Sequence, residues 1–161
     1  MWKAIIDSIK MKKGRRLVPY AVALAASQSV LASDTPITFL PMPGVTATLS
    51  VHGARVRLET TGRQGKRTET IEIETEKPIR IEVEDYNFDG HKDFSISHTD
   101  DGMGTYERFQ VRVFSPATGR FTLLASKCGD DFINLRVLKK ERTLVNAYVE
   151  ENVFKTCEMR F

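Results

Sequence analysis

Apolar and polar side chains alternate along many short segments of the chain. Between Thr70 and Glu76, Ile71 and Ile73 fall on one face of an extended chain, and three glutamates fall on the other. The segment Ile79–Glu84 repeats this alternation, with isoleucine and valine opposite arginine and glutamate. A period of two residues predicts antiparallel strands that bury one face and expose the other. We therefore expect the glutamates to form a solvated face of a sheet.

Ten segments have this strand character, and residues that favour turns separate them. The predicted strands are Thr46–Val51, Arg55–Glu59, Thr70–Glu76, Ile79–Glu84, Asp93–His98, Glu107–Ser115, Arg120–Leu124, Phe132–Leu138, Thr143–Val149 and Val153–Arg160. Gly62–Lys66 is the predicted tip of a hairpin, and no long helical period follows residue 32. Many short strands with frequent turns predict an all-β, mainly antiparallel fold. The expected architecture is a single β-sandwich or barrel-like domain over residues 33–161.

The first 32 residues have the three-part layout of a secretory signal peptide. A basic cluster at residues 12–16 precedes the apolar run Leu17–Leu31, and Val30-Leu31-Ala32 resembles the end of a cleaved signal. Met11 would begin a better-proportioned signal and is a candidate translation start; a core helix is the alternative interpretation of the run. The run is short and interrupted by Ser and Gln, so no membrane insertion is expected after its removal. The expected location is the periplasm.

Removal of residues 1–32 changes the charge of the chain. The signal holds six of the 24 basic residues and one of the 21 acidic residues, so the net charge changes from +3 to −2. The basic character of the full sequence therefore belongs to the precursor. It gives no argument for nucleic-acid binding.

Two cysteines remain after export, Cys128 and Cys157. In an oxidising compartment they are expected to form a disulfide. Two buried free thiols are the alternative. A zinc site is disfavoured, because neither cysteine has a second cysteine or a histidine at ligand spacing.

The segment Asp85–Asp93 has the composition of a calcium-binding loop. The predicted ligands are the side chains of Asp85, Asn87, Asp89 and Asp93 and the backbone carbonyl of His91. Gly90 allows the sharp turn, but no Glu follows at the last position of an EF-hand loop, and a strand precedes the segment. Calcium prefers such oxygen ligands, and the ion would join the strands on either side. The alternative is an Asx-rich turn without metal.

The segment Ile79–Phe121 also resembles a known family. It contains Asp-Tyr-Asn-Phe-Asp-Gly-x-x-Asp-Phe, a glycine-containing loop, an aromatic strand and Ser-Pro-Ala-Thr-Gly-Arg-Phe. This order resembles a family of exported bacterial proteins. Some members are immunity proteins that neutralise peptidoglycan-hydrolase toxins of contact-dependent secretion systems, and they look similar to periplasmic lysozyme inhibitors. The resemblance implies a β-rich fold, a calcium loop and a cysteine pair.

Inhibitors of this kind insert a Ser-Gly-x-x-Tyr loop into the cleft of lysozyme. The corresponding segment here is 100–106, in which an aspartate replaces the serine and one residue is added. The partner-binding residues that the resemblance implies are Asp100, Asp101, Gly102, Met103, Gly104 and Tyr106. We expect the calcium ion to fix the base of this loop. The alternative is an ordinary hairpin loop with Tyr106 in the core.

The sequence contains no motif that is typical of an enzyme. It has no nucleophile elbow, no HExxH metal motif and no phosphate-binding loop. The leading hypothesis, which the family resemblance implies and the export signal supports, is a calcium-stabilised immunity protein, not an enzyme, that blocks a lysozyme-like cell-wall hydrolase. A calcium-stabilised carbohydrate-binding or adhesion module is the alternative. An uncommon hydrolase is a third hypothesis.

Overall fold

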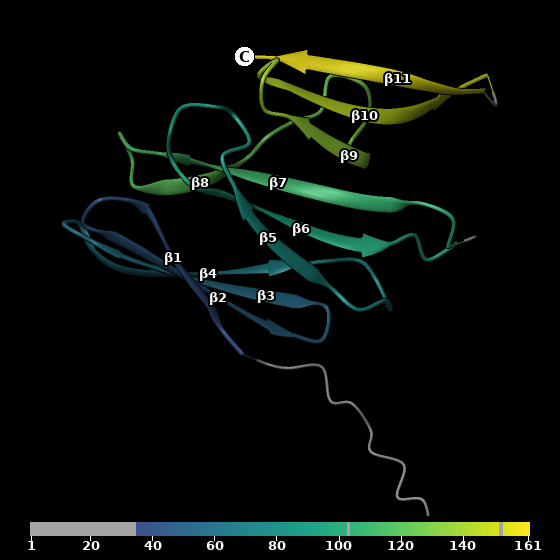
Figure 1. The fold of residues 1–161 in the computed structure, drawn as a ribbon. Coiled ribbons are helices and arrows are strands. Elements are labelled where there is room, and N and C mark those ends of the chain that lie inside the picture. Colours follow the sequence, from purple (N-terminus) through teal and green to yellow (C-terminus); the bar gives the residue numbers. More distant parts are fainter. Residues whose placement is uncertain (1–34, 103, 152) are drawn as a thin grey trace, which may run out of the picture. The chain divides into compact units, whose positions relative to one another are not determined.

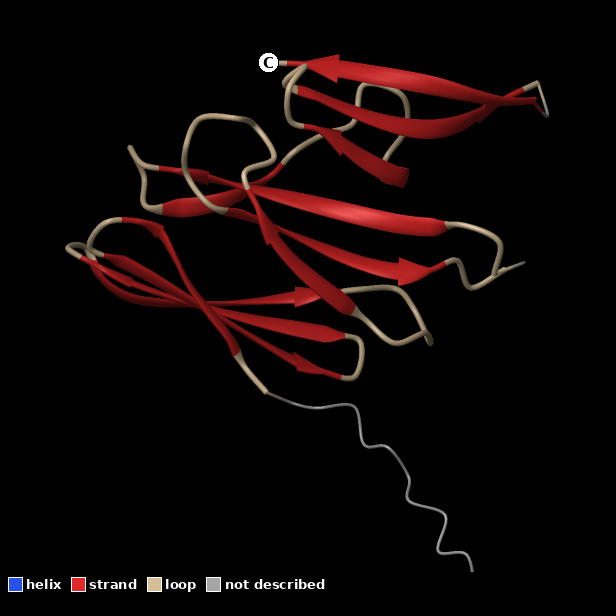
Figure 2. Ribbon diagram, viewed as in Figure 1, coloured by secondary structure: helices blue, strands red, loops and turns tan. Residues whose placement is uncertain are grey.

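The computed structural model describes residues 35–102, 104–151 and 153–161, and these residues form antiparallel strands joined by turns (Figure 1). The strands are β1 (Ile37–Met42), β2 (Val45–His52), β3 (Arg55–Gly62), β4 (Gly65–Glu72), β5 (Arg80–Glu84), β6 (Asp93–Thr99), β7 (Glu107–Ser115), β8 (Arg120–Leu123), β9 (Phe132–Leu138), β10 (Thr143–Glu150) and β11 (Val153–Arg160). The fold is all-β, as predicted (Figure 2). The predicted signal peptide lies outside the described residues. Within these residues, no helix is long and apolar enough to cross a membrane.

The predicted strands are present, with two differences. Strand β1 was not predicted; it contains Pro41 next to its end and pairs with β2 alone. Proline donates no backbone hydrogen bond and is tolerated at a sheet edge, so its presence hid the strand. The strand predicted at Thr70–Glu76 begins earlier, at Gly65, and ends at Glu72. The hairpin tip at Gly62–Lys66 is confirmed as a tight turn in which Gly62 pairs with Gly65.

The strands form two sheets. Hairpins join β1, β2, β3 and β4 into a four-stranded sheet in chain order. The second sheet has the order β11-β10-β9-β7-β6-β5. Strand β7 pairs with β9 through its first half and with β8 through its second half. Figure 1 shows β9, β10 and β11 on the side of β7 that faces away from the four-stranded sheet.

The first core lies between the two sheets. Apolar residues of the four-stranded sheet, such as Leu49 and Val56, pack on one face of β6, β7 and β8. Three phenylalanines dominate that face: the rings of Phe94 and Phe114 lie 5.0 and 5.2 Å from the ring of Phe121, in edge-on or tilted geometry. This arrangement is a β-sandwich, and it confirms the predicted fold class.

The second core lies on the other side of β7. It gathers Tyr86, Val111, Phe132, Leu144 and Met159, which come from the loop after β5 and from β7, β9, β10 and β11. The curl of the second sheet thus buries β6 on both faces, and residues 93–98 are all buried. By contrast, the glutamates of residues 72–76 are exposed, as the sequence predicted.

The cysteine pair connects the loop before β9 to the outermost strand of the second sheet. The sulfur atoms of Cys128 and Cys157 lie at bonding distance, 2.14 Å. The 29-residue separation encloses β9 and β10, so the bond restricts the part of the sheet that carries the second core. A cysteine pair of this kind is compatible with an oxidising compartment.

Replacement of both cysteines by serine is expected to lower the free energy of unfolding by about 3–4 kcal/mol. The estimate follows from the loop-closure entropy that a crosslink over 29 residues removes from the unfolded chain. Urea denaturation of the wild type and the Cys128→Ser/Cys157→Ser variant measures the difference. A midpoint that is the same in both proteins, with the same denaturant slope, would contradict a stabilising disulfide.

Candidate calcium site and the loop at the far end of strand β6

Residues 85–92 form the connection between β5 and β6, which we call the 85–92 loop. Glu84 and Asp93 are paired at its base, so the loop closes an antiparallel hairpin. Phe88 has a φ of +57° and Gly90 a φ of +88°, so the chain enters the left-handed region twice within three residues. Gly90 adopts this conformation without steric cost.

The polar side chains of this loop turn toward its own backbone. Asp85 accepts hydrogen bonds from the N–H groups of Asp89 at 3.1 Å and Gly90 at 2.9 Å. Asn87 accepts from Asp89 N–H at 3.2 Å, and Asp89 accepts from His91 N–H at 2.8 Å. The amide of Asn87 also donates to Asp89. The predicted ligands at positions 1, 3 and 5 are therefore gathered on the inside of one tight turn.

Asp93 occupies a different environment. Its side chain is fully buried and accepts three backbone hydrogen bonds: Oδ2 from Tyr86 and Asn87 at 2.8 and 3.3 Å, and Oδ1 from Phe114 at 2.8 Å. Burial raises the pKa of Asp93 to about 6, and the three N–H donors oppose that rise. Asp93 thus joins the 85–92 loop to β7 through its carboxylate.

Two aromatic residues of the loop, Tyr86 and Phe88, pack into or against the second core. Tyr86 is buried, and its hydroxyl shares a 2.7 Å hydrogen bond with Ser95. Burial raises the pKa of Tyr86 to about 12. The half-buried ring of Phe88 lies 5.7 Å from that of Phe161, and the carbonyl of Phe88 accepts a hydrogen bond from Arg142. These contacts attach the loop to the second core.

The arrangement of the oxygen donors determines what a metal ion could use. Among the described residues, no group of three or more His, Cys, Asp or Glu is arranged to hold a metal. Asp93 already accepts three hydrogen bonds, which leaves about one of the four acceptor positions that a carboxylate offers. Asp85 and Asp89 keep spare positions, and neither forms an ion pair within the described part of the chain. The ring centroids of His91 and Phe114 lie 6.1 Å apart in edge-on geometry, so the imidazole of His91 packs against the first core.

The predicted partner-binding residues lie between β6 and β7, which we call the 100–106 loop. Asp100 N–H donates to the carbonyl of Tyr106 at 2.9 Å, and its carboxylate accepts from Gly102 at 3.1 Å. A hydrogen bond to Asp100 raises the pKa of Tyr106 above its usual value. Asp101 accepts from the N–H of Glu76 at 3.0 Å, and this bond lowers the pKa of Asp101. The loop is therefore held at both aspartates, while Met103 lies outside the described residues.

The two loops lie at opposite ends of β6 (Figure 1). The 85–92 loop precedes Asp93 and the 100–106 loop follows Thr99, so seven extended residues, roughly 20 Å, separate them. The prediction that a calcium ion fixes the base of the 100–106 loop is therefore wrong. What fixes that base is hydrogen bonding by Asp100 and Asp101.

A groove of about 560 Å³ lies beside the 100–106 loop, and we call it the Tyr106 groove. It is lined by Tyr106, Arg108, Cys128, Gly129, Asp130, Asp131, Ile133, Tyr148 and Glu150. Arg108 donates to Asp131 at 2.8 and 3.1 Å across its floor. Tyr106 was predicted from the sequence. Tyr148, Arg108 and Asp131 were not, because only the pairing of β7, β9 and β10 brings these residues together.

Comparisons of the chain with protein-family models, with curated proteins and with solved structures find no match. The class that the fold defines is a β-sandwich protein with a disulfide. Any more specific function must be inferred from the loops and the groove.

Replacement of Asp93 by alanine is expected to lower the free energy of unfolding by at least about 3 kcal/mol. Three N–H groups lose their acceptor, two of them buried, and each buried donor left unpaired costs roughly 1–3 kcal/mol. The matched control is Asp89→Ala, which removes an exposed carboxylate of the same loop. Urea denaturation in the presence of EGTA separates this effect from that of any bound ion. Equal losses in the two variants would show that Asp93 has no special role.

Proposed function

We propose that the exported chain is a periplasmic immunity protein that binds a cell-wall hydrolase and blocks its cleft. The observation that carries the proposal is the 100–106 loop, which is exposed at its tip and held by hydrogen bonds at its base. A binding loop that is already ordered loses less conformational entropy when it meets its partner. The resemblance to secretion-system immunity proteins also implies that the 100–106 loop is the partner-binding segment.

The chemistry of the loop suits insertion into another protein. Gly104 has a φ of +64°, and together with Gly102 it leaves the backbone free for close approach. Tyr106 is half-buried and borders the groove, so part of its ring remains available. Tyrosine is enriched among the residues that contribute most to protein interfaces. Asp101 is exposed and keeps a negative charge at the base of the loop, where one carboxylate oxygen accepts the N–H of Glu76 and the other lies 3.8 Å from His98.

The charge of the Tyr106 groove favours a cationic partner. Asp130, Asp131 and Glu150 line it. Arg108 pairs with Asp131 and Lys155 pairs with Glu150, so among the described residues Asp130 is the lining acid without an ion pair. Opposite charges speed association, so a hydrolase with a positive surface for its anionic cell-wall polymer would suit this groove. An acidic groove beside the inserted loop would attract such an enzyme and orient it.

We also propose that the 85–92 loop binds a structural calcium ion. Asp85, Asn87 and Asp89 supply hard oxygen donors from the inside of one turn, and among the described residues the two carboxylates have no basic partner. The ion would stabilise the β5–β6 hairpin. Its location at the far end of β6 separates this role from partner binding.

A carbohydrate-binding module is the second candidate. The observation that favours it is the pair of tyrosines, Tyr106 and Tyr148, in one groove with the Arg108–Asp131 ion pair. Aromatic faces and charged hydrogen-bonding groups also suit a sugar. This candidate requires binding to peptidoglycan fragments by the chain alone, whereas the inhibitor requires binding to the enzyme.

Tyr106→Ala is expected to weaken inhibition of the target hydrolase by about 30-fold or more, which corresponds to the roughly 2 kcal/mol that defines an interface hot spot. The measurement is the inhibition constant of residues 33–161 against a panel of purified muramidases and amidases, with soluble peptidoglycan fragments tested in parallel by calorimetry. Asp101→Ala should weaken inhibition less strongly, and Glu82→Ala, an exposed acid on β5, is the matched control. If Tyr106→Ala and Asp101→Ala both inhibit like the wild type, the 100–106 loop is not the binding element. Binding to the fragments without inhibition of any enzyme would favour the second candidate.

Millimolar calcium is expected to raise the melting temperature by about 5–10 °C over the value in EGTA. An ion at about 100 times its dissociation constant adds roughly 2.7 kcal/mol to stability, and about 2–4 °C accompanies each kcal/mol in a domain of this size. Scanning calorimetry measures the shift, and the Asp85→Asn/Asp89→Asn variant should lose it. Equal melting temperatures of the wild type in calcium and in EGTA would show that the 85–92 loop binds no stabilising calcium ion.

A further inference from the structure

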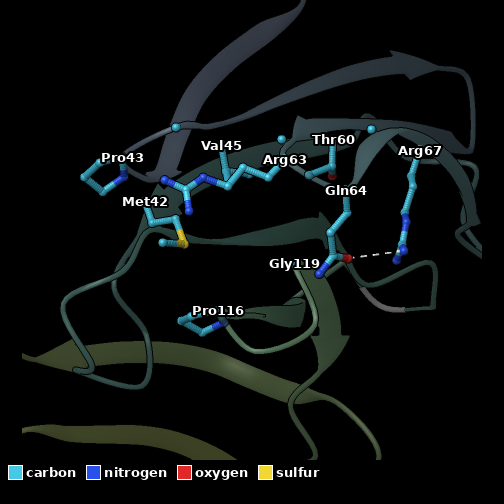
Figure 3. Close-up of a pocket in the computed structure, with 12 residues that line it drawn as sticks. Met42, Pro43, Val45, Thr60, Arg63, Gln64, Arg67, Pro116 and Gly119 are labelled. Atoms are coloured by element: carbon cyan, nitrogen blue, oxygen red, sulfur yellow. Dashed lines mark hydrogen bonds between the residues drawn. The ribbon is translucent and has the colours of Figure 1, made fainter.

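Three turns meet at the end of the sandwich that lies away from Tyr106. They are the β1–β2 turn at Pro43-Gly44, the β3–β4 turn at Arg63-Gln64 and the β7–β8 turn that contains Pro116. Together they enclose a pocket of about 320 Å³, which we call the arginine pocket (Figure 3). It is lined by Met42, Pro43, Gly44, Val45, Thr60, Gly62, Arg63, Gln64, Gly65, Arg67, Pro116 and Gly119. The nine residues of β7 separate it from the Tyr106 groove, so it is a distinct site.

Backbone contacts fix the shape of this pocket. A Cβ atom at Gly62 would lie 3.2 Å from the side chain of Val45, so the β3–β4 hairpin packs tightly on β2. In the β7–β8 turn, the carbonyl of Ser115 accepts hydrogen bonds from Thr118 at 3.2 Å and Gly119 at 2.8 Å. The pocket is therefore formed before any ligand arrives, as is usual for small-molecule sites.

The charge of the arginine pocket is positive. Two arginines line it and no acidic residue does. Within the described part of the chain, Arg63 has no acidic partner, and Arg67 donates to the neutral oxygen of Gln64 at 3.3 Å. The neighbouring Lys66, by contrast, is neutralised by Glu59 at 2.9 Å. An exposed guanidinium next to a pocket is suited to a carboxylate, which it binds through two parallel hydrogen bonds.

The remaining lining is mainly apolar. Met42, Val45 and Pro116 provide hydrocarbon surface, and Thr60 provides a hydroxyl. Figure 3 shows the Arg63 side chain reaching toward Met42 and Pro43, so the charge lies beside the apolar surface rather than away from it. The volume is at the lower end of the usual range for ligand pockets, roughly 300–1,000 Å³. The arginine, the apolar lining and the small volume together suit a small molecule that has an anionic group at one end and a short apolar group at the other.

We propose that the arginine pocket binds a small carboxylate with a short apolar group, such as the C-terminal residues of a peptide or a free short-chain carboxylic acid. Arg63 holds the carboxylate, and Met42, Val45 and Pro116 contact the apolar part. Arg67 contributes positive potential and holds Gln64 through its hydrogen bond. The site is independent of the proposed inhibition, which uses the other end of β7.

The test is a titration of 15N-labelled protein, residues 33–161, monitored through its backbone amide and arginine Nε–H signals. The probes are N-acetyl-Ala-Ala with a free carboxylate, the same dipeptide as its C-terminal amide, and butyrate. The free-acid dipeptide is expected to shift the signals of residues 42–45 and 62–67 with a dissociation constant on the order of 1 mM. The amide is expected to bind at least tenfold more weakly, because a charge-assisted pair is lost.

Substitutions test which residue binds the carboxylate. Arg63→Gln is expected to weaken binding of the free-acid dipeptide about tenfold, and Arg67→Gln less. Lys66→Gln is the matched control, since it removes the same charge from the same hairpin outside the pocket lining. These side chains are exposed, so the amide spectrum of each variant should show an intact fold.

The three probes separate the two sources of the carboxylate. Binding of the dipeptide acid without butyrate supports a peptide C-terminus, and equal binding of butyrate supports a free carboxylic acid. The proposal is overturned if neither acid binds or if the amide binds as well as the acid. It is also overturned if Lys66→Gln weakens binding as much as Arg63→Gln.

Discussion

The carboxylate of Asp93 is the interaction on which the rest of the structure depends. A buried carboxylate loses several kcal/mol of hydration, and only strong hydrogen bonds can offset that loss. Here the N–H groups of Tyr86, Asn87 and Phe114 supply them, and burial still raises the pKa to about 6. These three bonds join the 85–92 loop, β6 and β7 at one point. Because the carboxylate is committed to the backbone, Asp93 is first a structural residue, and Asp85, Asn87 and Asp89 are the side chains left to hold an ion.

The double burial of β6 follows from the same arrangement. Phe94 and Ile96 face the first core, while Ser95 and Ser97 are buried on the opposite face. Small polar side chains fit there, since the sheet curls closely over β6 and Ser95 pairs with the hydroxyl of Tyr86. A central strand buried on both faces has no room to move independently. It therefore holds its two end loops at a fixed separation.

Much of the fold could be predicted from alternation alone, because the strands that face water on one side carry the period of two in their residues. The alternation in β6 predicted where the strand lies. It did not predict that the face with Ser95 and Ser97 is buried, since serine is found both in buried and in exposed positions. Strand β1 was missed because Pro41 looks like a break, and only pairing with β2 shows that it lies at an edge. The groove was missed for a related reason: Tyr106 and Tyr148 are far apart in sequence, and the register of β7, β9 and β10 brings them together. Nearness in sequence likewise suggested that the two loops of β6 cooperate, whereas the length of an extended strand separates them.

The antiparallel order of β6 and β7 decides which sites share an end of the sandwich. The start of β6 lies beside the end of β7, as the bond from Phe114 N–H to Asp93 shows. The 85–92 loop therefore lies at the same end as the β7–β8 turn of the arginine pocket. It also contacts β1 directly, because Lys92 N–H donates to the carbonyl of Pro41 at 3.0 Å, and Met42, the next residue, lines that pocket. An ion in the 85–92 loop could therefore affect the position of Met42 in the arginine pocket, through the hydrogen bond between Lys92 and Pro41. It would reach the 100–106 loop only through the whole of β6, so an ion there would affect the proposed partner binding only through the stability of the fold.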